Sequence, residues 1–437
     1  PREAFGHDAL VTGDPSTLSG DNESQSLSDA KPVAEFIAGF PISEASKAQL
    51  LALYEVSRDP LAGKALEEKL RLLKTTSYRD YLIKICGCSE EAANCFQGRT
   101  LEFYGLGCDF VPAADAHEMG YPGFAGLKLP GGTAPEWKEP YIYHFPDGNA
   151  SLARLLVRSL APAVAPGHSM EDVILAPFDY SKLDVRGQSV RIRLDSTCVH
   201  VHNASDRVHV AYVRHGALHR VEARHAVLAC FNMIIPYIMP ELPAPQRAAL
   251  AQNVKVPLVY TNVLVRNWQP WVRLGVHDIS APMSFHCRVK LDSPVTLGGY
   301  HHPRDPEGPI LLHLVHVPSA PKQALDARTQ FRIGRGKLLT MTFDDFEERI
   351  RDELDRMLGK GGFSSARDIS QITVNRWSHG YSYVANSLFD RDDYGDVLKE
   401  ARRTAGRVAI ANTDAGGDAW AHYAIDQAHR AVQELVG

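Results

Sequence analysis

The stretch Gly406–Val432, GRVAIANTDAGGDAWAHYAIDQAHRAV, constrains the fold of this chain more than any other segment. Residues Arg407 to Ala411 have the apolar character of a short buried strand. A polar turn that contains glycines follows, and a helix comes after the turn. A helix that begins after such a turn presents free backbone N–H groups and the positive end of its dipole. The pattern therefore predicts a site for an electron-rich ligand at this turn.

The helix after the turn carries small and apolar residues at helical spacing, which predicts one face packed against a sheet. On the outer side, Asp426 and Arg430 have the spacing of a surface ion pair. The alternative is a helix that docks on the protein and binds nothing. The residues expected on the packed face are Ala421, Ala424, Ile425, Ala428, Ala431, Val432 and Leu435.

Composition narrows the class of protein. The chain has 437 residues, of which 44% are hydrophobic and 23% charged, as is typical of a globular chain with room for two large domains. The formal charge of −5 and the pI near 6.5 provide no broad basic face, so we expect no nucleic-acid partner. We find no apolar run near the roughly 18 residues that a membrane-spanning helix needs, and we expect no membrane span.

The seven cysteines do not predict a metal site. Four of them lie close together, but their spacing lacks the paired C-x2-C knuckles of a zinc ribbon. We therefore expect buried structural thiols and no bound metal. The four residues are Cys86, Cys88, Cys95 and Cys108.

Hydrophobic periodicity changes along the chain and predicts a mixed α/β fold. A polar surface loop is expected over residues 14–31, and a mainly helical block from Ser43 to about Thr100. Short alternating strands then form a meander that leads into one apolar strand, Ala226 to Cys230. Later segments alternate between the two types: helices at PAPQRAALAQN and FDDFEERIRDELDRML, and strands at KVPLVYTNVLV, PVTLGGYHH, PILLHLVHV and DISQITVNRW.

Several segments, taken in order, resemble the flavin-containing amine oxidase superfamily. ARHAVLACFNMIIPYIMPELPAPQRAAL resembles its strand that ends at the cofactor, NVKVPLVYTNVLVRNWQPW the next strand with its lysine, and ANTDAGGDAW the last flavin-binding turn. Together with EPYIYHFPDGNASLARLLVRSL and ITVNRWSHGY, they are most similar to the bacterial spermidine dehydrogenase-like group. The resemblance implies FAD as cofactor, an amine as substrate and a redox protein as a possible electron acceptor. It also favours the periplasm over the cytoplasm.

The resemblance implies a Rossmann-like FAD-binding domain that is split along the chain, plus a substrate domain with a mixed sheet. One departure concerns the family's G-x-G-x-x-G turn, because GLGCDF has only Gly105 and Gly107 and follows a predicted helix. We expect that turn on a second polypeptide or on a missing part of this chain. The expected divisions are an N-terminal remnant (1–40), a helical part of the substrate domain (41–185), the middle FAD segment (186–235), the substrate sheet (236–380) and the C-terminal FAD segment (381–437).

Four residues are candidates for catalysis. The resemblance implies that Lys255 holds a water against flavin N5, and the alternative is an edge-strand lysine that points into solvent. Trp377, Tyr381 and Tyr383, at a strand end and in the loop after it, would form aromatic walls that align a neutral amine. Aromatic residues in such a loop can equally serve packing alone.

The cofactor-binding candidates cluster around the two FAD segments. Asp414 would lie near the ribityl chain and pyrophosphate, with an ordinary helix N-cap as the alternative. Asn412 belongs to the same turn, and backbone N–H groups near Tyr423 and Ala424 would meet flavin O2 and N1. In the middle FAD segment, the resemblance is looser and implies three more residues: Cys198 and Val199 near the adenine, and Cys230 at the end of the apolar strand.

The expected reaction is transfer of a hydride equivalent from the carbon next to a neutral amine to the flavin, followed by hydrolysis of the imine. A flavin-dependent desaturase or isomerase and a non-catalytic flavoprotein-like subunit remain as alternatives. Some spermidine dehydrogenases also carry haem, and a b-type haem bound through one histidine stays open. His313 and His316 lie three apart in a predicted strand, so they face opposite sides and do not form a joint metal site.

Overall fold

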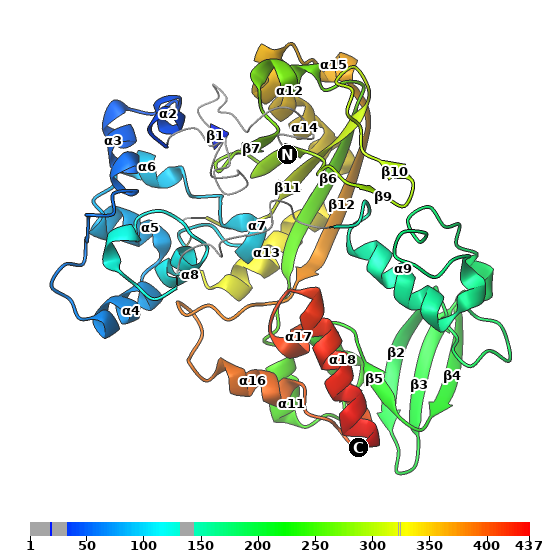
Figure 1. Cartoon of the computed structure of the whole chain (residues 1–437). Coiled ribbons are helices and arrows are strands. Elements are labelled where there is room, and N and C mark those ends of the chain that lie inside the picture. The colour runs from blue at the N-terminus through cyan, green and yellow to red at the C-terminus, as the bar shows by residue number, and fades with distance from the viewer. Residues whose placement is uncertain (1–17, 20–32, 132–143, 322, 324) are drawn as a thin grey trace.

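The computed structural model describes residues 18–19, 33–131, 144–321, 323 and 325–437. The protein has the mixed α/β fold expected from its sequence: a six-stranded sheet, a three-stranded meander and a parallel strand pair, surrounded by helices (Figure 1). The surface loop predicted over residues 14–31 lies outside the described residues, apart from strand β1. Part of the predicted EPYIYH segment also lies outside them.

The helical block predicted near the N-terminus is present, and its helices pack around one aromatic cluster. The Tyr81 ring stacks on Phe124 at 4.7 Å, and its hydroxyl donates to the Gly123 carbonyl at 2.6 Å. The four neighbouring cysteines are buried here as free thiols, as expected. The elements are α2 (Val33–Ala38), α3 (Glu44–Ala52), α4 (Leu66–Thr75), α5 (Tyr78–Asp80), the π-helix η1 (Tyr81–Ile85), α6 (Glu90–Asn94), α7 (Leu101–Tyr104), α8 (Ala113–Glu118) and η2 (Ala125–Leu127).

The six-stranded sheet has the order β1-β7-β8-β11-β6-β12, and all its neighbouring strands are antiparallel. Strand β6, which lies between β11 and the edge strand β12, forms where a strand was predicted, with Val259 and Val263 in the core and Tyr260 and Asn262 on the other face. The strands are β1 (Leu18–Ser19), β6 (Val256–Val265), β7 (Asp278–Ser280), β8 (Arg288–Leu291), β11 (Ile310–His316) and β12 (Ile369–Tyr381).

Two strand predictions need correction. The segment PVTLGGYHH forms two short strands, β9 (Thr296–Leu297) and β10 (Tyr300–His301), because Gly298 and Gly299 both adopt positive φ and turn the chain back. Strand β12 continues past the predicted end at Trp377 to Tyr381, so Tyr381 lies in the strand and not in the loop after it.

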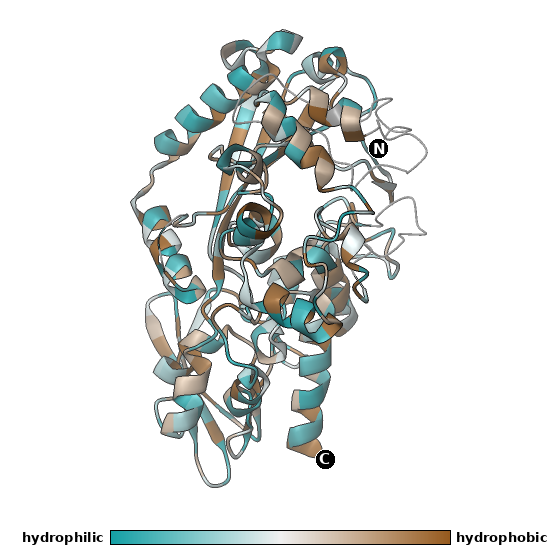
Figure 2. Ribbon diagram, turned by 90° about the vertical axis from the view of Figure 1, so that its left-hand side faces the viewer, coloured by the Kyte–Doolittle hydropathy of each residue, from teal (hydrophilic) through white to brown (hydrophobic). Residues whose placement is uncertain are grey.

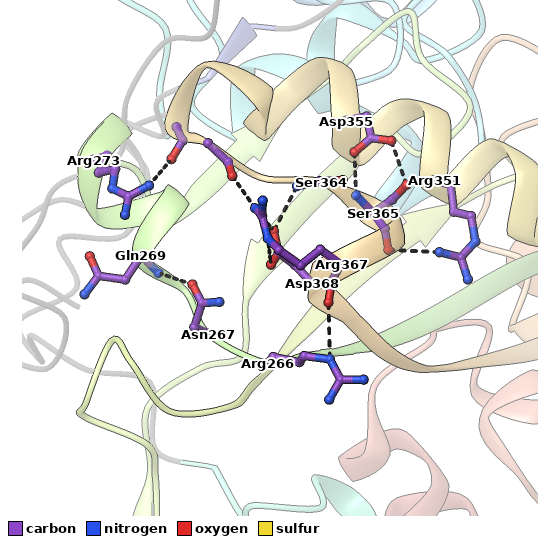
Figure 3. A network of polar contacts seen from close by, with 12 residues as sticks. Arg266, Asn267, Gln269, Arg273, Arg351, Asp355, Ser364, Ser365, Arg367 and Asp368 are labelled. Atoms are coloured by element: carbon purple, nitrogen blue, oxygen red, sulfur yellow. Dashed lines mark hydrogen bonds and ion pairs between the residues drawn. The ribbon is translucent and has the colours of Figure 1, made fainter.

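Helices cover one face of the large sheet, and their contacts form its main core. The helix predicted at FDDFEERIRDELDRML is α14, which begins at a capping box between Thr342 and Asp345. After α14, the buried Asp368 carboxylate accepts from the Ser364 N–H and from Arg367, and Arg266 donates to the Arg367 carbonyl (Figure 3). The helices are α12 (Gln269–Leu274), α13 (Ala327–Thr340), α14 (Phe343–Leu358), η6 (Gly359–Gly361) and α15 (Ser365–Asp368).

The meander and the parallel pair lie at the other end of the molecule (Figure 1). Strand β13 pairs with β5 in parallel, which brings together the two strands predicted around 226–230 and 407–411. The elements of this part are α9 (Asn149–Leu160), η3 (Pro162–Val164), η4 (Tyr180–Lys182), β2 (Ser196–Asn203), β3 (Val208–Arg214), β4 (Ala217–Ala223), β5 (Ala226–Leu228), η5 (Asn232–Ile234), α10 (Ile235–Ile238), α11 (Ala244–Leu250), α16 (Tyr394–Ala401), β13 (Val408–Ile410), α17 (Thr413–Gly416) and α18 (Ala421–Val436).

The prediction for the packed face of α18 was largely wrong. Ala431 is fully buried, but Ile425 and Val432 are 56% and 49% exposed. Helix α18 stands at the edge of the molecule with apolar segments along it (Figure 2). Arg430 pairs with Glu434 at 2.7 Å and not with Asp426. In the described part of the chain, no helix is long and apolar enough to cross a membrane.

Candidate functional site

The parallel pair brings two polar segments to one edge. Because β5 and β13 are parallel and in register, their carboxyl ends lie side by side, and the Ala411 N–H donates to the Leu228 carbonyl at 3.0 Å. The chain after β5 enters η5 at Asn232, and the chain after β13 enters the predicted polar turn. Ligands of open α/β sheets bind outside the carboxyl ends of the strands. This edge is therefore the place to look for a site.

The turn after β13 contains a short helix that the sequence did not predict. Asn412 has φ of 98° and ψ of 164°, a backbone conformation that residues other than glycine rarely adopt, and its side chain accepts from the Thr413 N–H. The one-turn helix α17 follows and is capped by Gly417, which also has positive φ. Helix α18 begins only at Ala421, so its free N–H groups are separated from the turn by α17.

Asp414 and Lys255 form a buried ion pair at this edge. The Lys255 Nζ lies 2.7 Å from Asp414 Oδ1, and Asp414 Oδ2 accepts from the Asn232 N–H at 2.9 Å. Asp414 is fully buried, and Lys255 is 6% exposed. Lys255 therefore does not point into solvent, and Asp414 is not an ordinary N-cap, because its carboxylate bonds across the chain.

A row of side-chain amides extends from this pair and was missed from the sequence. Asn232 Nδ2 donates to Asn253 Oδ1 at 2.9 Å, and Asn253 Nδ2 donates to the Tyr394 hydroxyl at 3.1 Å. Asn232 is fully buried, yet its Oδ1 has no hydrogen-bond partner among the described residues. The available signal was the presence of these polar residues inside the apolar runs CFNMIIP and QNVKVP. A buried acceptor without a donor is suited to a ligand that brings one.

The three predicted aromatic residues occupy different surroundings. Trp377 is 54% exposed on β12, whereas Tyr381 is half-buried with its hydroxyl against that of Tyr260. Burial raises the pKa of both tyrosines, so both stay protonated at neutral pH. Tyr383 lies in the core, where its hydroxyl donates to Asp390 at 2.7 Å. Trp377 and Tyr381 thus keep part of their surface exposed, whereas Tyr383 is a core residue.

His379 adds a titratable group near the ion pair. Its ring stacks on Phe231 at 4.7 Å, next to the Asn232 that contacts Asp414, and its Nδ1 lies 3.0 Å from Ser378 Oγ. Burial, followed by the positive charges of Arg335 and Lys255, lowers the pKa of His379, and Asp414 opposes this shift. The imidazole is therefore neutral at pH 7.

The remaining predicted residues lie around the same end of the molecule. Cys198 is half-buried in β2 and Val199 sits at the bulge that follows, 40% exposed. Cys230 follows β5, and burial raises the pKa of its thiol to about 11. Tyr423 and Ala424 are half-buried in the first turns of α18, with the Tyr423 ring close to Gly416 of α17.

Two further features lie away from this edge. A cavity of about 480 Å³, lined by residues that include His225, Arg407 and Glu434, opens at the amino ends of β5 and β13. His313 and His316 face opposite sides of β11, as predicted: His313 lies 3.3 Å from Asn262 Oδ1, and His316 stacks on Phe285. Within the described ranges, no group of three potential ligands could hold a metal ion, and no observation there supports a b-type haem.

Comparisons with known proteins give a distant likeness. No protein-family model matches the chain, and no curated protein matches its sequence. Among solved structures, putrescine oxidase bound to putrescine has a TM-score of 0.48 and 14% identity, covering 98% of this chain and 79% of that chain. Cyclohexylamine oxidase from Brevibacterium oxydans IH-35A has a TM-score of 0.47 and 14% identity, covering 98% and 82%. These TM-scores are too low to assign a function.

Proposed function

We propose that this chain forms most of an FAD-dependent enzyme that oxidises an amine. The observation that carries the proposal is the buried Lys255–Asp414 ion pair at the carboxyl ends of β5 and β13. Burying two charges is costly, and a purely structural contact is often served as well by apolar residues. A charge held at the ligand edge of a parallel pair is the arrangement expected of a functional site.

The residues at this edge fit a flavin nucleotide. The unpartnered Asn232 Oδ1 is suited to a hydroxyl such as those of the ribityl chain, and the Asn412 turn offers backbone N–H groups to the nucleotide. Asp414 and Cys230 would lie along the same wall. When bound, the flavin would accept a hydride equivalent from the carbon next to the amine nitrogen.

The protein's own groups would prepare the amine. Trp377 and Tyr381 would orient it, because aromatic faces attract an ammonium and then enclose its neutral form. An ammonium must lose a proton before its neighbouring carbon can release hydride. His379 would accept that proton, since its lowered pKa keeps the imidazole neutral at pH 7. Lys255, fixed by Asp414, would supply a positive charge and a hydrogen-bond donor at the reacting centre.

We also propose that a further polypeptide segment completes the nucleotide site. The backbone groups of Arg407 and Ala411 bond to the β5 segment, so those of Ile410 point to the opposite edge of β13. Among the described residues, the Ile410 carbonyl accepts only from the Arg430 side chain. The exposed Ile425 and Val432 on α18 favour a cover over this end. A strand that carries the glycine-rich turn would pair with this edge of β13 and would cover the exposed side chains of α18. Denaturing gel analysis and the intact mass of flavin-loaded protein test this, because one 48.2 kDa species that keeps FAD would contradict it.

Flavin reduction tests the function itself. Purified protein, with any subunit that co-purifies, should be yellow and should bleach when amines are added without oxygen. Lys255→Met should slow bleaching at least about tenfold per bound flavin. Lys337→Met is the matched control, because that exposed lysine donates to the Ser319 carbonyl and to no other group among the described residues. A yellow protein that no amine bleaches would favour a desaturase or isomerase, and a colourless one a non-catalytic subunit.

A further inference from the structure

Arg335 on α13 differs from the other arginines that are buried or half-buried in the described part of the chain. Each of the others contacts a carboxylate, a carbonyl or an aromatic ring there, whereas Arg335 makes no hydrogen bond, ion pair or ring contact with those residues. A guanidinium carries five N–H donors and stays charged at neutral pH. The Arg335 guanidinium is half-buried and has no acceptor among the described residues, so its donors are available to an anionic ligand.

The position of Arg335 connects it to the candidate site. The neighbouring Gly334 packs so closely that a Cβ there would lie 2.3 Å from the Pro318 carbonyl oxygen and 3.0 Å from Pro257, two residues after Lys255. Helix α13 also packs on β12, which carries His379. The charge of Arg335 contributes to lowering the pKa of His379. Arg335 therefore belongs to the surroundings of the proposed amine-binding groups.

The charges around Arg335 favour an anion. Burial and the adjacent positive charge of Arg332 lower the pKa of Arg335, and no carboxylate opposes them. Arg328, two helical turns earlier, does have a carboxylate partner: it lies 2.7 Å from Asp390, and its guanidinium is 4.2 Å from the centre of the Tyr383 ring. The second ammonium of a diamine would be repelled at Arg335, while a carboxylate would meet a planar pair of donors that matches its geometry.

We propose that Arg335 binds a carboxylate of the substrate, so that the amine oxidised here is an amino acid or another amine that carries a carboxylate. This inference rests on the proposed function. The sequence resemblance implies polyamine-like substrates, and this inference adds amines that carry a carboxylate. Trp377 and Tyr381 would then surround the amine end, and Arg335 would fix the acid end.

The test compares substrates that differ only in the carboxylate. Ornithine and putrescine form one such pair, and phenylalanine and phenethylamine form another. We expect the carboxylate-bearing member of at least one pair to reduce the flavin with a KM at least about tenfold lower. Arg335→Met should remove this preference by raising KM for the amino acid alone, and Arg335→Lys should keep part of it. Arg332→Met, a change at the exposed neighbour, should leave the preference in place.

Binding without turnover gives a second readout. Benzoate carries a carboxylate but cannot be oxidised by loss of hydride next to an amine, and its binding should perturb the flavin absorption of the wild type but not of Arg335→Met. If only the members without a carboxylate reduce the flavin, the proposal for Arg335 is wrong while the proposed function stands. If flavin is retained and no amine of either kind reduces it, the proposed function fails. If Arg335→Met loses flavin instead, the anion bound by Arg335 is a cofactor phosphate, which also overturns the proposal.

Discussion

The Lys255–Asp414 pair should show strong energetic coupling. Both side chains are almost completely buried, and Asp414 has one other partner, the Asn232 N–H. Lys255→Met leaves a buried carboxylate without its counter-charge, which typically costs about 3–5 kcal/mol of the free energy of unfolding. Asp414→Asn likewise leaves the buried Lys255 ammonium without its counter-charge. The double variant carries neither charge, so its loss should fall short of the sum of the single losses by about 2–3 kcal/mol.

Urea unfolding, followed by tryptophan fluorescence and circular dichroism, measures the four free energies of this cycle. Lys399→Met is the control, because that lysine pairs with Asp396 on the exposed side of α16, and its unfolding midpoint should not change. Additive losses in the double variant would refute the reasoning. They would mean that the two charges are not in contact in the folded protein.

Three further predictions concern packing and charge. Gly336→Ala should raise the free energy of unfolding by about 0.5–1 kcal/mol, since its Cβ would meet no atom within 4 Å. Gly334→Ala in the same helix should lower the free energy of unfolding, because its Cβ would lie 2.3 Å from a backbone oxygen. Thermal unfolding of the two variants measures both effects. Burial lowers the pKa of His316 to about 3, so between that value and about 6.5 the unfolded chain binds a proton that the folded chain does not. The free energy of unfolding should therefore fall by about 1.4 kcal/mol for each pH unit below about 6.5, with no such loss above that pH. His316→Gln should remove this pH dependence in urea titrations. Ile425→Asp on the exposed side of α18 should leave unfolding unchanged but weaken retention of any covering segment in gel filtration, while Ala431→Asp should unfold this end.

Local patterns predicted much of the secondary structure. The strand predicted at KVPLVYTNVLV and the helix predicted at FDDFEERIRDELDRML were confirmed as β6 and α14, because side-chain burial follows the backbone period within one element. Failures occurred where a local pattern depends on distant packing. The apolar side of α18 is regular in sequence, but only part of it meets β13, so Ile425 remains exposed.

The candidate site likewise contains residues that the sequence predicted and contacts that it did not. Lys255 and Asp414 were each predicted from their own segments, but neither segment indicates that the two side chains bond to each other. Asn232 and Asn253 were missed, because an asparagine near a helix end usually serves a cap or a turn. Tyr383 shares a segment with Tyr381, yet it turns into the core toward Asp390.

The sequence by itself determined the class of fold, the strand and polar turn near the C-terminus, and the residue types available at that turn. These features follow from local backbone preferences and from the periodicity of apolar residues, which act over a few residues. Only the tertiary structure decided which buried charge meets which. It also decided that, among the described residues, Asn232 Oδ1 has no donor and Arg335 has no acceptor. Lys255 and Asp414 are 159 positions apart. Such contacts depend on how β5, β6 and β13 come together, because the energy of a buried polar group is set by its neighbours in space and not by its neighbours along the chain.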